Sequence, residues 1–261
     1  MHRALVTGGT SGIGAAFSEA FARRGVDLVI VARDRERLES FAASIRERFG
    51  VQVETFPADL TLRDDQARVV RRIETDTAEQ PAIDTLVNNA GFSVRTDILG
   101  DDLSLHDAGF EVMVRAVLYL SGAAGRTFAA RGRGWIINVT SSSAFVPQNN
   151  YSAIKAWAQT YTEALAVRLA GTGVQVTALA PGWVRTEFHQ RAGIKGSSIP
   201  GFLWLKPERL VEECLRDVAR GKVLSVPSKR FKLIVALARL APRSLIHWVS
   251  AKLTARRNRE K

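Results

Sequence analysis

Near its start the chain reads Ala4-Leu5-Val6-Thr7-Gly8-Gly9-Thr10-Ser11-Gly12-Ile13-Gly14. The short apolar run predicts a β-strand, and the helical pattern from residue 13 predicts a helix directly after the turn. The glycines allow a tight turn, close approach of the backbone to a pyrophosphate, and near contact between helix and strand. The helix start adds free N–H groups and the positive end of a dipole. We therefore predict that a dinucleotide is bound by Gly8, Thr10, Ser11, Gly12, Ile13 and Gly14, although a glycine-rich turn without a ligand has the same pattern.

Strands and helices alternate along the rest of the chain. Short apolar runs predict strands at residues 4–7, 28–32, 51–56, 85–88, 135–139, 174–180 and 223–226. Helical periodicity predicts helices at 13–25, 34–49, 62–79, 103–131, 152–171 and 207–220. This alternation is typical of an α/β fold, a Rossmann-type doubly wound parallel sheet of about seven strands with helices on both faces. We expect residues 1–227 to form this single domain and residues 228–261 to form a helical extension.

Composition and length narrow the class of protein. The chain has 261 residues, of which 46% are hydrophobic and 24% are charged, as in ordinary globular proteins. Cys214 is the only cysteine, so an internal disulfide is excluded, which suits a reducing cytoplasm. No apolar stretch approaches the roughly 18–20 residues of a membrane-spanning helix. We expect a cytoplasmic protein that does not cross a membrane.

The positive charge is concentrated at the C-terminus. Residues 228–261 contain ten Lys or Arg and one acidic residue, so they carry +9 of the net charge of +11 and leave +2 for the rest. The pattern predicts two helices that separate near Pro242, the second of them basic and amphipathic. Such a helix lies on an anionic membrane surface, docks on an acidic partner, or covers the body of its own chain. Basicity confined to one segment without a recognition motif argues against nucleic-acid binding.

The residue after the second strand indicates which dinucleotide is bound. In this fold an acidic side chain there binds the 2′-hydroxyl of NAD, whereas an arginine accommodates the 2′-phosphate of NADP. The chain has Arg33 at this point, with Arg35 and Arg37 close behind. A planar guanidinium that stays charged suits a phosphate dianion, so Arg33 favours NADP(H) over NAD. The alternative is that Arg33 only begins a solvated helix.

Four further segments resemble, in order, the motifs of the short-chain dehydrogenase/reductase family. They are Asp59-Leu60, Asn88-Asn89-Ala90-Gly91, Tyr151-Ser152-Ala153-Ile154-Lys155 and Pro181-Gly182-Trp183-Val184-Arg185-Thr186. The resemblance covers about residues 3–190 and implies hydride transfer between NADP(H) and a carbonyl or secondary alcohol. It also implies that the cofactor is contacted by Asp59, Leu60, Asn89, Ala90, Gly91, Tyr151, Lys155, Pro181, Gly182, Val184 and Thr186.

Tyr151 and Lys155 suit this chemistry independently of the resemblance. Reduction of a carbonyl by hydride leaves an alkoxide that needs a positioned acid. A tyrosine with a pKa near 10 acts poorly at neutral pH unless a cation stabilises its phenolate. Lys155 lies four residues after Tyr151, on the same helix face. We therefore predict a catalytic pair, and the alternative is a chance pair on a solvated helix.

The resemblance implies a third catalytic residue, a serine after the fifth strand. Alignment on Asn-Val-x-Ser favours Ser141, with Ser142 as second choice. Ser141 precedes Tyr151 by ten residues, fewer than is usual in the family, so the connecting loop is short. Met113 occupies the position of the family's usual asparagine, which relays protons to the lysine. This departure motivates an alternative function, an NADPH-binding regulatory or scaffold protein with reduced or no turnover.

The segment after Thr186 commonly covers the substrate in this family. Here it contains His189 and the apolar residues Phe188, Ile199, Pro200, Phe202, Leu203, Trp204 and Leu205. We expect either a lid for a bulky apolar or acyl substrate, as in reductases of lipid or acyl carbonyls, or side chains that pack the core. No spacing among the histidines indicates a metal site. The resemblance further implies a homo-oligomer that forms through the long central helices.

Overall fold

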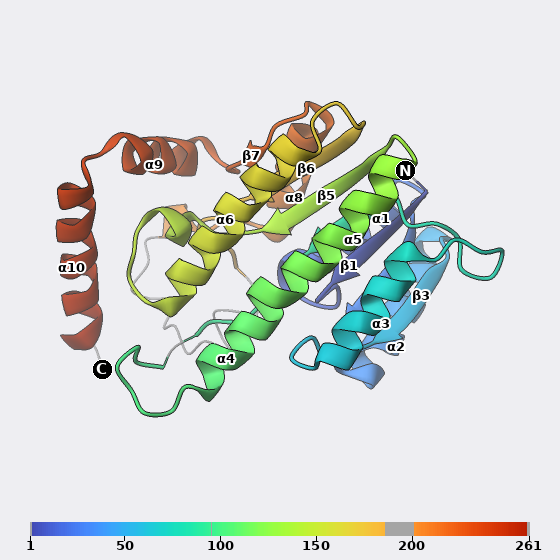
Figure 1. The fold of residues 1–261 in the computed structure, drawn as a ribbon, viewed down its shortest axis with the longest axis horizontal. Helices are drawn as coiled ribbons and strands as arrows, with labels where there is room; N and C mark the ends of the chain where they lie inside the picture. Colours follow the sequence, from blue (N-terminus) through green and yellow to red (C-terminus); the bar gives the residue numbers. More distant parts are fainter. Residues whose placement is uncertain (1, 95, 186–200, 260–261) are drawn as a thin grey trace.

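The computed structural model describes residues 2–94, 96–185 and 201–259. Within these residues, seven parallel strands form one sheet in the order β3-β2-β1-β4-β5-β6-β7. The strands are β1 Arg3–Thr7, β2 Asp27–Ala32, β3 Val53–Pro57, β4 Thr85–Asn88, β5 Gly134–Val139, β6 Val174–Leu179 and β7 Leu224–Ser225. Their core residues are buried because helices cover both faces of the sheet (Figure 1). The predicted Rossmann-type fold is confirmed.

The helices form a layer on each side of the sheet. One layer contains α1 Gly12–Ala22, α2 Arg35–Phe49 and α8 Pro207–Ala219. The other contains α3 Arg63–Glu74, α5 Ala116–Ala130 and α6 Asn150–Arg168, which lie in front of the sheet in Figure 1. The shorter elements are α4 Ser104–Phe110, the 3-10 turns η2 Ser142–Phe145 and η4 Gly201–Leu203, and the π-helical turn η1 Glu111–Arg115. The helix predicted at 103–131 is therefore divided into α4, η1 and α5.

The sheet order places a crevice between β1 and β4. The chain builds β1, β2 and β3 in one direction and then returns to place β4 on the other side of β1. Ligands of open α/β sheets bind at such a switch point, beyond the carboxyl ends of the strands. Thr7 ends β1 and Asn88 ends β4, so the glycine turn and the Asn88–Gly91 segment both begin at this crevice.

A buried polar network joins the centre of the sheet to two helices. Asn88 and Asn138 are register partners on β4 and β5, and Asn88 Nδ2 donates to Asn138 Oδ1 at 2.9 Å. Asn88 Nδ2 also donates to Ser121 Oγ of α5 at 2.9 Å. Asn138 Nδ2 donates to Thr162 Oγ1 of α6 at 3.0 Å. These partners satisfy amides that would be costly to bury alone, so the network fixes α5 and α6 relative to β4 and β5.

The C-terminal extension forms two helices, α9 Lys229–Leu240 and α10 Arg243–Arg259. They separate at Ala241, whose ψ of 141° is extended because the residue before a proline is excluded from the helical region. Phe231 and Val235 of α9 are buried in a cluster with Ala180 and Val226 of the main body. Within the described ranges, no helix is long and apolar enough to span a membrane.

We expect Asn138→Leu to lower the free energy of unfolding by about 1–3 kcal/mol, because the Asn88 amide and the Thr162 hydroxyl each lose one hydrogen-bond partner. Urea denaturation of wild type and variant measures this loss. Thr160→Leu, at an exposed position on α6, is the control. An Asn138 variant as stable as this control would show that the network contributes nothing.

Candidate active site

The start of α6 is fixed by a reciprocal cap. The Asn149 side chain accepts a hydrogen bond from the Ser152 backbone N–H at 3.1 Å, and Ser152 Oγ accepts one from the Asn149 N–H at 3.1 Å. This capping box satisfies two donors at the helix end and sets where the helix begins. Tyr151 therefore lies in the first turn of α6 and Lys155 lies one turn later, as their spacing predicts.

Tyr151 and Lys155 meet at the end of β5. The Lys155 ammonium lies 5.7 Å from the centre of the Tyr151 ring and donates to the backbone carbonyl of Val139 at 2.9 Å. Burial lowers the pKa of Lys155 to about 8 and raises the pKa of Tyr151 to about 12. In the cofactor-free protein at neutral pH the tyrosine is therefore a neutral phenol, able to donate a proton.

Ser141 lies beside Tyr151. A hydrogen bond between the two side chains opposes the effect of burial on the Tyr151 pKa. Ser141 Oγ also accepts from the backbone N–H of Ser143 at 3.1 Å and from Ser143 Oγ at 2.8 Å, which makes it the cap of η2. This single 3-10 turn, followed by the cap at Asn149, brings Ser141 to Tyr151 despite the short loop.

Met113 lies near Lys155, within the π-helical turn η1. It is buried, and a Cβ placed on Gly91 would lie 3.0 Å from Met113 Sδ and 3.8 Å from Lys155 Nζ. The thioether thus occupies the space beside Lys155 in which the resemblance implies an asparagine. Isolated π-turns within helices frequently occur at functional sites.

The glycine turn has the close packing that a dinucleotide loop requires. A Cβ on Gly14 would lie 2.1 Å from the Gly8 carbonyl oxygen and 2.5 Å from Asn89 Nδ2, so a side chain there would displace the backbone. Gly8 has a φ of +62°, which favours glycine. Asn89 Nδ2 donates to the Thr7 carbonyl at 2.9 Å and the Gly8 carbonyl at 3.1 Å. Asn89 therefore fastens the ends of β1 and β4 together at the crevice.

Thr7 is a structural part of this site that the sequence did not single out. Its Oγ1 accepts from the backbone N–H groups of Asn89 and Ala90, each at 3.0 Å, and donates to the Val87 carbonyl at 3.3 Å. A threonine directly before the first glycine is the only local signal. Its three partners lie between 80 and 83 residues away in the sequence. They become neighbours of Thr7 only because β4 pairs with β1 in the sheet.

The N-terminus of α1 is prepared for an anion. Ser11 is the cap residue, but its side chain makes no capping hydrogen bond, and the first turn has no acidic residue. The first N–H groups of the helix therefore have no partner within it. Thr10, Gly12 and Ile13 are partly exposed around this end. These features and the glycine packing fit the phosphates of a dinucleotide.

Two arginines lie beside the same loop. Arg37 Nη2 donates to the Thr10 carbonyl at 3.3 Å, so its guanidinium lies against the phosphate turn. Arg33 follows β2 with its side chain 67% exposed, and its Nη1 is 4.0 Å from Asp59 Oδ2. Their position beyond the end of β2 is where the adenosine ribose lies in this fold, so both suit a phosphate on that ribose.

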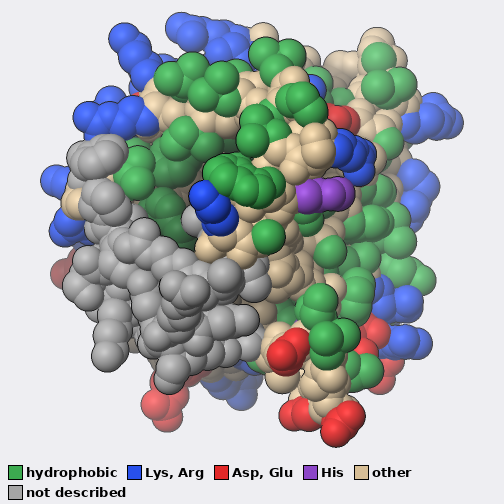
Figure 2. All heavy atoms as spheres, turned by 90° about the vertical axis from the view of Figure 1, so that its left-hand side faces the viewer, with side chains coloured by type: hydrophobic (Ala, Val, Ile, Leu, Met, Phe, Trp, Pro, Cys, Tyr) green, Lys and Arg blue, Asp and Glu red, His purple; other side chains and the backbone are tan. Residues whose placement is uncertain are grey.

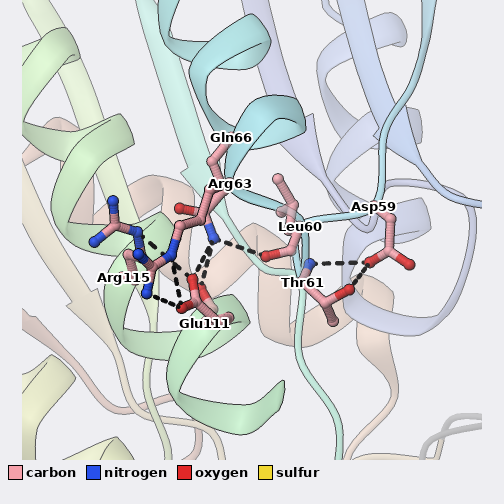
Figure 3. Close-up of polar contacts among 7 residues, drawn as sticks. All are labelled: Asp59, Leu60, Thr61, Arg63, Gln66, Glu111 and Arg115. Carbon is pink, nitrogen blue, oxygen red and sulfur yellow. Dashed lines mark hydrogen bonds and ion pairs between the residues drawn. The ribbon is translucent and has the colours of Figure 1, made fainter. Parts of the chain in front are cut away.

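The segment Asp59-Leu60, for which the resemblance implies contact with the cofactor, is held in place by α3 and η1 (Figure 3). Asp59 Oδ1 accepts from the Thr61 N–H at 2.9 Å and from Thr61 Oγ1 at 2.8 Å. Gln66 Nε2 donates to the Leu60 carbonyl at 2.9 Å and to Glu111 Oε2 at 3.1 Å. The Leu60 side chain is buried in the core, so it is the backbone and the Asp59 carboxylate that remain for a ligand.

The segment after β6 forms an apolar wall. Pro181 and Val184 are buried, and Val184 pairs with Leu205 in an isolated parallel bridge. Trp183 and Trp204 rings lie 6.2 Å apart. Gly182 packs directly against the Phe231 ring, which leaves no room for a Cβ. Leu203 and Leu205 of the predicted lid thus pack against the body, while Thr186, Phe188, His189, Ile199 and Pro200 lie outside the described residues.

The described part of the chain contains no group of three His, Cys, Asp or Glu side chains arranged to hold a metal ion. Among the described residues, Tyr151 and Lys155 are the titratable pair at the end of β5, whereas Arg33, Arg37 and Asp59 lie beside the glycine turn.

Comparison with known proteins agrees with this geometry. Residues 2–195 match the family model described as short chain dehydrogenase. An uncharacterised oxidoreductase from Staphylococcus saprophyticus is 35% identical over 186 residues, which cover 70% of this chain and 78% of that protein.

Two solved structures share the whole architecture. A short-chain dehydrogenase from Sphingobium yanoikuyae in complex with NADPH has a TM-score of 0.83 at 32% identity, with 92% of this chain and 94% of that chain covered. The bulky-bulky ketone specific alcohol dehydrogenase from Comamonas testosteroni has a TM-score of 0.78 at 30% identity, with 92% of each chain covered.

The chain belongs to the short-chain dehydrogenase family, as its motifs predict. It is an oxidoreductase that uses a nicotinamide dinucleotide.

The buried Lys155 predicts a pH dependence of stability. Its pKa is lowered from 10.5 to about 8, so between these values the unfolded chain binds more protons than the folded one. Relative to Lys155→Met, the wild type should gain stability as pH rises from 8 to 10.5, by at most about 3 kcal/mol. Above pH 10 Tyr151, with its pKa raised to about 12, acts in the opposite direction.

Urea unfolding of the cofactor-free protein at about pH 7.5, 8.5 and 9.5 measures this gain. Lys252→Met, at an exposed position on α10, is the matched control. A stability difference between wild type and Lys155→Met that does not change over this range would contradict a lowered lysine pKa.

Proposed function

We propose that this chain is an NADP(H)-dependent carbonyl reductase, or the corresponding alcohol dehydrogenase in the reverse direction. The observation that carries the proposal is the hydrogen-bonded pair Ser141 and Tyr151 with the Lys155 ammonium beside them. All three lie at the ends of β5 and α6, next to the crevice at which the dinucleotide loop begins.

The chain's own residues divide the work between binding and proton transfer. Gly8, Gly14 and the N-terminus of α1 hold the diphosphate, with Arg33 and Arg37 at the adenosine end. The nicotinamide, when bound, supplies or accepts the hydride. Tyr151 donates the proton that the carbonyl oxygen needs in reduction. Ser141 orients that oxygen through its hydroxyl, and the positive charge of Lys155 stabilises the phenolate that remains.

Met113 stands where the family usually has the asparagine that relays protons to the lysine, so this site lacks that relay residue. A thioether is only a weak acceptor and donates no hydrogen bond, so Met113 cannot hold a relay water as an amide does. Lys155 Nζ instead donates to the Val139 carbonyl. Slow reprotonation of Tyr151 would favour the second candidate function, a dinucleotide-binding regulatory or scaffold protein with reduced or no turnover.

The proposed substrate is a bulky apolar ketone or an acyl carbonyl. The wall beside the site is apolar, since Leu203, Leu205 and Trp183 pack with Phe231 and with Phe145 of η2. A relative of the same architecture is described as specific for bulky-bulky ketones, which supports the size class. Apolar walls gain affinity from burial of ligand surface.

We further propose a homo-oligomer that forms through α5 and α6. The small residues Ser121, Ala123 and Ala124 are buried within the chain itself. The apolar side chains that α5 and α6 leave exposed are Leu118 at 43%, Tyr119 at 46% and Val167 at 80%. An interface that covers them would remove this surface from water.

Tyr151→Phe should reduce kcat for ketone reduction by about 10²–10⁴-fold, because the ring remains but the proton donor is lost. NADPH oxidation, followed by its absorbance against ketones of increasing size and long-chain 3-oxoacyl thioesters, measures this. The Kd for NADPH should change little. Tyr119→Phe, on the exposed face of α5, is the control.

Turnover that survives Tyr151→Phe would overturn the proposed mechanism. NADPH binding without turnover on any carbonyl would favour the regulatory function, and Met113→Asn would then test whether the missing amide is the reason.

Arg33→Ser should raise the KM for NADPH about tenfold or more and leave the KM for NADH nearly unchanged, because a hydrogen bond to a charged group contributes about 1.5–3 kcal/mol. NADH has no 2′-phosphate with which to make that bond. Steady-state kinetics with both cofactors measures the ratio, and Arg71→Ser, exposed on α3, is the control. Equal effects on both cofactors would mean that Arg33 is only a solvated residue before α2.

A further inference from the structure

Helices α9 and α10 expose a group of large apolar side chains. Phe231 and Val235 are buried against the body, while α9 turns other apolar residues to the solvent at helical spacing. We call this surface the tail face; it consists of Leu233, Ile234, Leu237, Leu240, Leu245 and Trp248. Leu240 is 84% exposed and Leu237 is 60% exposed. Exposed apolar side chains gathered on one surface mark interaction sites.

The charge around the tail face has one sign. Residues 229–252 contain no Asp or Glu, and their cationic side chains are all exposed: Lys229, Arg230, Lys232, Arg239, Arg243 and Lys252. Figure 2, which faces α9 and α10, shows hydrophobic side chains with Lys and Arg around them, whereas Asp and Glu gather mainly at its lower edge. Lys252 Nζ lies 3.9 Å from the centre of the Trp248 ring. A tryptophan paired with a lysine suits the boundary between lipid and water.

A basic groove runs along one side of α9. It has a volume of about 220 Å³ and is lined by Lys222, Lys232 and Arg239, with Asp217 as the one acid among its lining residues. Lys222 bonds to Asp217 at 2.6 Å, and Lys232 also lies within electrostatic reach of Asp217 and Glu213. The lining residues still carry three positive charges against the one carboxylate of Asp217. The apolar side chain of Val235 also lines the groove. Such a groove suits a phosphate diester that carries apolar chains.

We propose that the tail face docks on an anionic phospholipid membrane. The exposed leucines and Trp248 enter the interfacial layer, and the groove cations Lys232 and Arg239 meet the lipid phosphates. Charge complementarity favours this occupant over a second copy of the same face, because two copies would place like charges together. The proposal goes beyond the proposed reaction. It places the membrane near the apolar wall, because α9 carries the exposed leucines of the tail face and also Phe231, which is buried in the wall.

Co-sedimentation of the full chain with vesicles tests the proposal without any requirement for turnover. We expect binding to phosphatidylcholine vesicles that contain about 30% phosphatidylglycerol at about 0.1 M NaCl. Binding should fall at least about tenfold at about 0.5 M NaCl or with phosphatidylcholine alone, because each basic residue near an anionic surface contributes to binding and salt screens that contribution.

Two double variants separate the apolar from the ionic contribution. Leu237→Ser with Leu240→Ser, and Lys232→Ser with Arg239→Ser, should each reduce binding about tenfold or more. Leu99→Ser is the apolar control because Leu99 is 88% exposed and lies in the loop before α4, outside the tail face. Arg71→Ser with Arg168→Ser, at exposed positions of α3 and α6, is the charge control. Circular dichroism and NADPH binding report whether each variant is folded.

Three results would overturn the proposal. The first is a wild type that does not sediment with anionic vesicles at the lower salt concentration. The second is a loss of binding as large in the controls as in the tail-face variants. The third is a change in oligomeric mass on Leu237→Ser with Leu240→Ser that leaves vesicle binding intact, which would assign the tail face to a second copy of the chain.

Discussion

Helix α1 begins so close to the end of β1 that position 14 has no space for a side chain. The Gly8 carbonyl and the Asn89 amide occupy the place where a Cβ would be, and the Asn89 amide uses this closeness to bond two carbonyls of the first turn. The contact directs the free N–H groups of α1 at the switch point of the sheet and ties the ends of β1 and β4 together. The position of a bound dinucleotide follows from this contact, and Arg33, at the end of β2, is placed relative to it by the parallel register of β1 and β2.

The proton-transfer side of the site depends on a second junction, between the end of β5 and the start of α6. Lys155 is bonded to the Val139 carbonyl, and Ser141 follows Val139 by two residues. The cap at Asn149 sets the phase of α6, so Tyr151 meets Ser141 while Lys155 meets the strand end. A buried lysine costs free energy, and the depressed pKa of Lys155 is the sign of that cost. The site thus tolerates a locally unfavourable group at the position where we propose that it assists proton transfer.

Features encoded by local spacing were predictable from sequence. The strand–turn–helix at Gly8–Gly14 and the four-residue spacing of Tyr151 and Lys155 need no knowledge of distant contacts, and both have the predicted local geometry. Thr7, the Asn88–Asn138 pair and the contact of Arg37 with Thr10 depend on which elements become neighbours, so no local pattern marks them. The π-turn at Met113 also has no signal, because helical periodicity continues through residues 103–131 and hides the extra residue. The role of Thr186 stays a prediction.

The tail, residues 228–261, differs from the rest of the chain in its basic composition, yet its helix α9 packs against the body of the protein. Phe231 lies on Gly182 so closely that any side chain at position 182 would collide with the ring, and the same cluster includes Phe145 of the turn capped by Ser141. Helix α9 is therefore a wall of the site on one side and an exposed apolar surface on the other. The Phe231 ring lies so close to Gly182 that α9 and the segment after β6 cannot move independently of one another. The tail thus links the outer surface of the protein to the region in which we propose that the substrate binds.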